Sequence, residues 1–224
     1  MGYINLHAHS MYSDGVSTIK AIAEESKRLS FDACVITDHV YNRKSPYSLN
    51  EKTFQMEIEE AKRVSEEIEI PVILGIELSV NLMEEFCIFG TEAIWEILKL
   101  RNKKEFISFT DLFKIKQNYN CIYNWCHPIH IDKFLESRGW FLLNGFEYIH
   151  CGHKTFEKED GVNELRKSIP KEIEDLNYLC NSDAHSAKSL SRCFMEIEKK
   201  ITNEEKLIEF FKVKNEILFV INNR

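Results

Sequence analysis

The chain has 224 residues, and its 29 basic and 36 acidic side chains give a formal net charge of −7. Hydrophobic residues make up 44% and charged residues 29%, which are proportions typical of a soluble globular protein with a core that needs no disulfide bonds. The negative charge argues against binding to duplex nucleic acid, and no apolar run reaches the ~20 residues that a membrane helix needs.

Cysteine usage and the first residues of the chain indicate a cytoplasmic protein. The 7 cysteines are odd in number, irregularly spaced and without a CxxC pair. Neither a disulfide framework nor a zinc ribbon is therefore expected. The N-terminal residues contain neither the basic nor the apolar region of a secretion signal. We therefore expect a reducing, cytoplasmic compartment.

In the first half of the chain, short apolar segments alternate with longer amphipathic ones. Strands are predicted at residues 3–6, 33–37, 71–76 and 86–89. Ser17 is predicted to cap a helix whose apolar residues recur at helical spacing. A second helix has one apolar face between Phe54 and Ile68, and a third is predicted near residues 92–103.

The second half of the chain continues this alternation. Thr110 is expected to cap a helix, and strands are predicted at residues 121–125, 146–149 and 178–180. Residues 202–205 have the pattern of a capping box, which predicts a helix after them. A last β-like run covers residues 216–221.

The alternation predicts an α/β fold with a parallel sheet and helices outside it. Seven repeats in 224 residues would be about 32 residues each, close to one βαβ step. No linker divides the chain, so residues 1–224 are expected to form a single domain with a small, incomplete barrel of TIM type. An open doubly wound sheet is the alternative, although the chain has neither GxGxxG nor GxxxxGK[ST].

Residues that can bind metal ions follow the predicted strands. His7 and His9 end the first strand, and because they lie two residues apart they point to the same face. The later strand ends and their loops add Asp14, Asp38, His39, Glu77, His127, Asp183 and His185. A barrel gathers strand ends at one mouth, where so much charge is costly without compensation. We therefore expect bound metal ions.

These motifs resemble those of the PHP (polymerase and histidinol phosphatase) superfamily. The matching segments occur in the family's order and cover most of the chain: His7-Ala8-His9, Ser13-Asp14-Gly15, Ile36-Thr37-Asp38-His39, Gly75-Ile76-Glu77, His127-Pro128 and Ser182-Asp183-Ala184-His185. The resemblance implies a distorted (β/α)7 barrel of TIM type, two or three divalent metal ions, and hydrolysis of phosphoesters.

The resemblance also implies a role for each ligand. One ion would be held by His7, His9, Glu77 and Asp183. A second ion would be shared with Glu77 and held by His127, and a third would be held by Asp14, His39 and His185. The same residues are the expected catalytic groups. Asp38 would instead fix an imidazole by a hydrogen bond.

Cys87 marks a departure from the family pattern. Short members of the family usually carry a histidine about ten residues after the glutamate, and here Cys87 takes that position. A thiolate can bind zinc or iron, so Cys87 is a candidate ligand of the second ion. The alternative is that Cys87 only packs in the core.

Mixed imidazole and carboxylate ligands suit zinc, manganese or iron. Such ions lower the pKa of bound water to about 7 and neutralise phosphoryl oxygens, so the expected nucleophile is a metal-bound hydroxide. Arg43 and Arg192, in loops after two of the motifs, are candidates to bind the substrate phosphate.

The predicted function is hydrolysis of a small phosphomonoester of the histidinol phosphate or nucleoside monophosphate class, which the family resemblance suggests. Three alternatives remain at this point. They are an exonuclease that shortens oligonucleotides from the 5′ end, a metal-binding module without turnover, and a C–N hydrolase of the amidohydrolase type. The expected partner is a small phosphorylated molecule, with no membrane and no duplex nucleic acid. The sequence does not indicate an oligomeric state.

Overall fold

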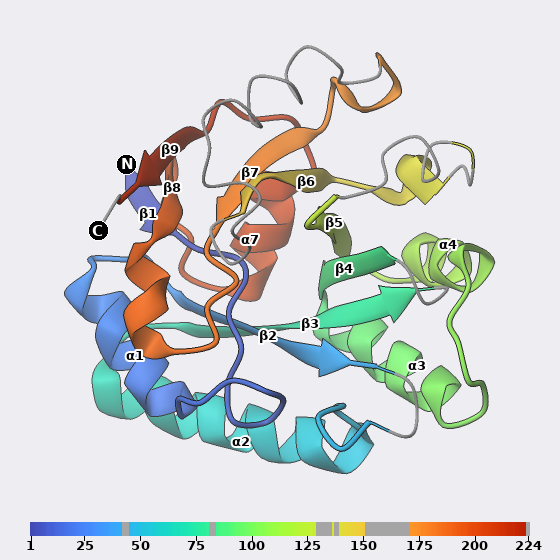
Figure 1. Ribbon diagram of the computed structural model, residues 1–224, viewed down its shortest axis with the longest axis horizontal. Helices are drawn as coiled ribbons and strands as arrows, with labels where there is room; N and C mark the ends of the chain where they lie inside the picture. The colour runs from blue at the N-terminus through green and yellow to red at the C-terminus, as the bar shows by residue number, and fades with distance from the viewer. Residues whose placement is uncertain (42–44, 81–83, 129–135, 137–138, 151–170, 223–224) are drawn as a thin grey trace.

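The computed structural model describes residues 1–41, 45–80, 84–128, 136, 139–150 and 171–222, which form two sheets with helices packed against them (Figure 1). The five α-helices in this part of the chain are α1 (Ile19–Arg28), α2 (Glu51–Ile68), α3 (Thr91–Arg101), α4 (Phe109–Asn118) and α7 (Glu204–Phe211). Helices α1 and α2 pack side by side on one side of the molecule (Figure 1).

The strands form one sheet of six and one of three. The six-stranded sheet has the order β2 (Cys34–Val40), β3 (Val72–Val80), β4 (Glu84–Phe89), β5 (Ile122–Cys126), β6 (Gly145–His150) and β7 (Asn177–Asn181). The three-stranded sheet has the order β1 (Gly2–Ile4), β8 (Cys193–Ile197) and β9 (Leu218–Ile221). The sequence pattern does not predict a strand at β8.

The predicted α/β fold is confirmed, but the sheet is mixed and not all parallel, and among the described residues it does not close into a barrel. Among the described residues, β4 runs antiparallel to both β3 and β5, whereas the pairs β2–β3, β5–β6 and β6–β7 are parallel. Only residues 81–83 separate β3 from β4. A parallel crossover needs about a dozen residues or more, so such a short connection can only reverse the chain.

The six-stranded ladder is open between β2 and β7, and residues 7–9 lie in this gap. The backbone nitrogen of Thr37 donates to Ala8 O at 2.8 Å. On the other side, Ala184 N donates to His7 O at 3.2 Å and His9 N donates to Ala184 O at 2.9 Å. These bonds place the His-x-His segment between β2 and the residues that follow β7.

Capping residues explain where the helices begin. Thr18, and not the predicted Ser17, caps α1 by accepting a hydrogen bond from Ala21 N. Ser108, and not Thr110, caps α4, in a capping box with Asp111. Each predicted cap lies within two residues of the observed one, because hydroxyl side chains flank both helix starts.

Both sheets and all five of these α-helices contribute buried apolar residues to one hydrophobic cluster. That residues 1–224 form one domain stays a prediction. In the part of the chain that the structure describes, no helix combines the length and the apolar character of a membrane span.

Candidate metal centre

The predicted ligands meet at one end of the six-stranded sheet, and six of the nine line a cavity of about 550 Å³. They come from the segment in the gap, from the loop after it, from the ends of β2 and β3, and from the residues after β5 and β7. The cavity is lined by Asp14, Val16, His39, Tyr41, Glu77, Glu85, His127, Asp183, His185, Ser186, Ser189 and Arg192.

Each of the two histidines expected for the first ion contacts both of the expected carboxylates. His7 Nε2 lies 3.3 Å from both Glu77 Oε2 and Asp183 Oδ1. His9 Nε2 lies 3.0 Å from Asp183 Oδ1 and 3.3 Å from Glu77 Oε2. His7, His9 and Glu77 are fully buried, and Asp183 is 9% exposed. His7, His9 and Asp183 each offer an atom to a common metal position.

The second expected position lies on the other side of Glu77. His127 Nε2 is 3.0 Å from Glu77 Oε1. His7, Glu77, His127 and Cys126 have ligand atoms that all lie within 4.8 Å of one another. Cys87 is the ligand that the sequence predicts here, but this group contains Cys126 in its place. Cys87 is the neighbouring thiol, with 3.2 Å between the two sulfur atoms.

The third expected position is centred on Asp14. Its Oδ1 lies 3.3 Å from His185 Nε2 and 3.5 Å from His39 Nε2. His9 joins these three residues in one group of possible ligands. His39 also reaches Glu77, through Nδ1 at 2.9 Å, so the third position adjoins the first.

The donor set fits a cation. Both oxygens of Glu77 are buried and lie within 3.3 Å of imidazole nitrogens, yet neither makes a hydrogen bond of acceptable geometry. Asp14 Oδ1 and His39 Nδ1 are likewise buried and make no hydrogen bond of acceptable geometry. A buried polar atom without a hydrogen bond costs about 1–3 kcal/mol, and more when charged. A divalent ion bound among these donor atoms would accept their lone pairs and so remove this cost.

The electrostatic environment holds Glu77 as a carboxylate. Burial alone would raise the pKa of Glu77, but the imidazoles of His7 and His39 hold it well below its usual range. Burial lowers the pKa of His9, which favours the neutral form that binds metal. Burial would also lower the pKa of His127, but the adjacent Glu77 carboxylate raises it to about 9. Pairing with Asp14 raises the pKa of His185 to about 9.

Asp38 supports the loop that carries Asp14 and does not fix an imidazole as predicted. It accepts hydrogen bonds from Ser10 N at 2.8 Å and from the hydroxyls of Ser10 and Ser13. Behind it lies Glu57 of α2, which is fully buried. Burial, together with the charge of Asp38, raises the pKa of Glu57 well above its usual range, so Glu57 is a neutral neighbour of Asp38.

Glu147 of β6 contacts two of the predicted ligands, and the sequence motifs do not mark it. Its Oε1 accepts hydrogen bonds from His7 Nδ1 at 2.7 Å and from Asn181 Nδ2 at 3.1 Å. Its Oε2 accepts from the backbone nitrogen of His127 at 3.0 Å. The carboxylate therefore fixes the His7 ring with Nε2 toward Glu77. Glu147 lies within the predicted strand 146–149, and its charge in an otherwise buried strand is the signal that could have revealed it.

Glu85 and Tyr41 are two further cavity residues outside the sequence prediction. Glu85 Oε2 lies 3.5 Å from His127 Nδ1, and its Oε1 accepts a hydrogen bond from Ser79 at 2.9 Å. The ring of Tyr41 stacks on His39 with 4.1 Å between centroids. Glu85 reaches the cavity because β4 runs antiparallel, which brings the start of that strand to the mouth.

Two of the predicted ligands have a backbone conformation that L-residues rarely adopt. The φ angles of His127 and Asp183 are 33° and 45°. Such angles cost of order 1–3 kcal/mol and occur often at functional sites. His127 directly follows β5, and Asp183 follows β7 after one intervening residue. The turn of the backbone brings His127 into contact with Glu77, and Asp183 into contact with His7 and His9.

Of the two arginines proposed for phosphate binding, only Arg192 is among the described residues. Arg192 lines the cavity beside Ser186 and Ser189. Arg43 lies outside the described residues. Among the described residues that line this cavity, Arg192 is the only arginine or lysine.

Five of the cysteines are free thiols and buried: Cys34, Cys87, Cys121, Cys126 and Cys180. Cys193 is disulfide-bonded, which the sequence analysis does not predict. Burial would raise the pKa of Cys87, but the hydrogen bond from Cys126 and the nearby His7 lower it. Burial raises the pKa of Cys34 to about 12, as expected for a thiol in apolar surroundings. The cytoplasmic location stays a prediction.

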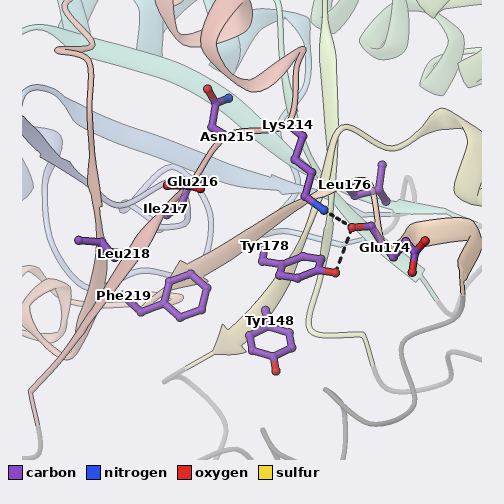
Figure 2. Close-up of a pocket in the computed structure, with 10 residues that line it drawn as sticks. All are labelled: Tyr148, Glu174, Leu176, Tyr178, Lys214, Asn215, Glu216, Ile217, Leu218 and Phe219. Carbon is purple, nitrogen blue, oxygen red and sulfur yellow. Dashed lines mark hydrogen bonds between the residues drawn. The ribbon is translucent and has the colours of Figure 1, made fainter.

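A larger cavity of about 640 Å³ lies away from these ligands (Figure 2). The rings of Tyr148 and Tyr178 stack on one side of it, with Phe219 nearby. The Nζ of Lys214 and the hydroxyl of Tyr178 both donate to the backbone oxygen of Glu174. Among the described residues that line it there is no histidine or cysteine.

Comparisons with solved structures support the fold. PsfC from Pseudomonas syringae is 12% identical, with 99% of this chain and 92% of that chain covered and a TM-score of 0.70. A proposed metal-dependent phosphoesterase from Bifidobacterium adolescentis is 15% identical, with 92% and 94% covered and a TM-score of 0.58. A lesion-specific endonuclease from Pyrococcus furiosus is 16% identical, with 94% and 56% covered and a TM-score of 0.56.

A search of curated proteins found no match. The PHP domain matches residues 5–211, a span that includes every predicted ligand. This match confirms the resemblance drawn from the motifs, and it indicates a metal-dependent hydrolase of the phosphoesterase type. The chain belongs to the PHP domain family.

Proposed function

We propose that the protein hydrolyses a small phosphomonoester, of the histidinol phosphate or nucleoside monophosphate class, with two or three divalent metal ions. The observation that carries this proposal is the set of imidazoles around the buried, hydrogen-bond-deficient carboxylate of Glu77, at a cavity of about 550 Å³. A cavity of this size suits a small molecule.

The residues divide into three groups of ligands. His7, His9 and Asp183 would hold the first ion, His127 with the neighbouring thiols the second, and Asp14, His39 and His185 the third. Glu77 lies between the first two groups and can serve both. Zinc, manganese or iron bound there would supply a water of lowered pKa and neutralise the phosphoryl oxygens.

The protein itself contributes orientation and charge. Glu147 holds the His7 ring, and Asp38 holds the loop that carries Asp14. Arg192 offers the phosphate a guanidinium whose paired N–H groups match its oxygens. Its place in the cavity lining supports the proposed role in substrate binding.

No side-chain nucleophile is needed in this proposal. Ser186 and Ser189 are the serines that line the cavity. Their hydroxyls lie 3.0 Å apart, and Ser189 also donates to the backbone oxygen of Ser186. Neither hydroxyl has a base as its hydrogen-bond partner, so neither is prepared to attack phosphorus.

Cleavage of short oligonucleotides is the second candidate, because one structural neighbour is an endonuclease. The cavity lining argues against it. It contains Asp14, Glu85 and Asp183 beside a single arginine, whereas a groove that follows a nucleic acid strand is positively charged.

The test is phosphate release from a panel of phosphomonoesters by protein loaded with zinc, manganese or iron. The panel contains histidinol phosphate, sugar phosphates and nucleoside monophosphates, and a 5′-labelled oligonucleotide is assayed in parallel. We expect turnover of one phosphomonoester, loss of turnover with chelator, and loss of most activity in Asp183→Asn. Mononucleotides released from the oligonucleotide, with no phosphate from the panel, would establish the second candidate. Silence in both assays from metal-loaded protein would favour a module without turnover.

A further inference from the structure

A pair of thiols lies beside the second metal position. Cys87 of β4 is directly opposite Glu77 of β3 and Asn124 of β5, and Cys126 is opposite Glu85. Residues that face each other across a ladder point to the same side of a sheet, so all five share the face that bears Glu77. Both thiols are 2% exposed, and their sulfur atoms are 3.2 Å apart.

We propose that Cys87 and Cys126 both bind the second metal ion, together with His127 and Glu77, and that this two-thiolate site selects zinc or ferrous iron over manganese and magnesium. The inference rests on the proposed metal-dependent function, which it deepens by naming the class of ion. It also adds Cys126, whose thiol the sequence motifs do not mark.

The distances are compatible with a shared ion. The ligand atoms of Cys126, Glu77, His127 and His7 lie within 4.8 Å of one another, and Cys87 adjoins this group through its sulfur contact with Cys126. A zinc–sulfur bond is about 2.3 Å, so two thiolates on a tetrahedral ion have sulfur atoms about 3.8 Å apart. Cys87 and Cys126 would therefore have to separate by only about 0.6 Å, which a change of side-chain torsion can supply.

A second observation indicates a ligand next to the thiols. The side chain of Asn124 is 1% exposed, and neither its oxygen nor its nitrogen has a hydrogen-bond partner. This amide lies on the same face as Cys87, directly across the ladder from it. Together with the Glu77 oxygens, it makes the surroundings of the thiol pair polar and incompletely satisfied, unlike a site of apolar packing.

The donor types determine which ion the site prefers. Thiolates are soft ligands that favour zinc and iron, whereas manganese and magnesium favour oxygen. The group around Asp14, His39 and His185 contains no sulfur. The same chain would then hold two kinds of site, one selective for a thiophilic ion and one more permissive.

The experiment uses Co²⁺ as the probe, because thiolate ligands give it an intense charge-transfer absorption in the near ultraviolet. The full-length chain is stripped of metal under a reducing, oxygen-free atmosphere and titrated with Co²⁺. We expect the band in the wild type, about half its intensity in Cys87→Ser and in Cys126→Ser, and zinc affinity lowered at least ~10-fold in each. Cys34→Ser, which removes another fully buried thiol, should leave the absorption band and the zinc affinity unchanged.

A measurement on the unmutated protein avoids any folding defect of the variants. Zinc should protect Cys87 and Cys126 from an alkylating reagent, with the modified positions mapped by mass spectrometry, and excess manganese should not. Absence of the band in the wild type, or an unchanged band in Cys126→Ser, would overturn the two-thiolate site. A normal band without phosphate release would leave this inference intact and contradict the proposed function.

Discussion

Glu77 is the residue on which the site depends most, because two groups of ligands meet at its carboxylate. Its oxygens lie within 3.3 Å of nitrogens from His7, His9, His39 and His127. The sequence motifs identify all of these residues, since each imidazole follows a predicted strand. The sequence does not indicate how they are held in place. That depends on Glu147, whose contacts span more than a hundred residues of chain.

The orientation of His7 gives a prediction about Glu147. In Glu147→Gln, the amide NH₂ would face a donor, either His7 Nδ1 or the His127 nitrogen, which now both donate to the carboxylate. The His7 ring would lose its fixed tautomer, and we expect metal affinity to fall roughly 10–100-fold, as is usual for such supporting groups. The affinity is measured by competition with a chelating dye.

Glu204→Gln is the matched control for this experiment. Glu204 is a partly buried glutamate that accepts hydrogen bonds from the nitrogen and hydroxyl of Thr91, with no ligand among its partners. Its variant should bind metal as the wild type does. A folded Glu147→Gln protein with unchanged metal affinity would show that His7 needs no such support.

At the scale of the elements, sequence periodicity predicts which segments form strands and helices, but not how strands pair. The apolar run at 86–89 predicts β4, yet its antiparallel direction follows only from the short connection to β3. β8 escapes prediction because it is short and follows the loop after Asp183 without a periodic pattern of its own. Helix starts are displaced by one or two residues because several hydroxyl residues compete for the cap.

The cap of α4 allows a direct test between two neighbouring residues. Ser108 accepts a hydrogen bond from Asp111 N at 3.2 Å, and Asp111 Oδ2 accepts in return from Ser108 N at 3.1 Å. Losing such a cap costs about 1 kcal/mol, so Ser108→Ala should lower the free energy of unfolding by about that amount. Thr110 lies inside the helix, so Thr110→Ala should change the free energy of unfolding little. Urea denaturation of both variants decides which residue is the cap, and a larger loss in Thr110→Ala would contradict the structure.

At the scale of the whole molecule, the metal centre joins parts of the chain that are far apart in sequence. Its ligands come from residues 7–14, from β2 and β3, and from the segments after β5 and β7. The ladder is open between β2 and β7, and the residues that fill this gap carry His7 and His9. Among the described residues, backbone hydrogen bonds connect these two edges of the sheet through residues 7–9, and an ion bound there would hold the edges together.

Metal binding should therefore stabilise the folded protein. The unfolded chain scatters these ligands, so the ion binds mainly the native state, and at 100 times the dissociation constant it adds about 2.7 kcal/mol. We expect Tm to rise with zinc concentration in the wild type and to fall with chelator. His9→Ala, which removes a ligand shared by two groups, should show a much smaller rise.

The size of this stabilisation should depend on pH, and the protonation of two histidines determines the direction of the dependence. The pKa values of His127 and His185 are raised to about 9 by their carboxylate partners, so without metal both hold protons at neutral pH. Their pairing stabilises the metal-free fold fully below the unfolded pKa of about 6.5, and that stabilisation is lost as pH rises through 9.

A metal ion must displace the same protons, so its affinity grows over this interval. The rise in Tm on adding zinc should therefore be larger at pH 8 than at pH 6. A rise that is equal at both pH values would show that these two imidazoles do not bind the ion, whereas no rise at either would show that the centre does not bind zinc.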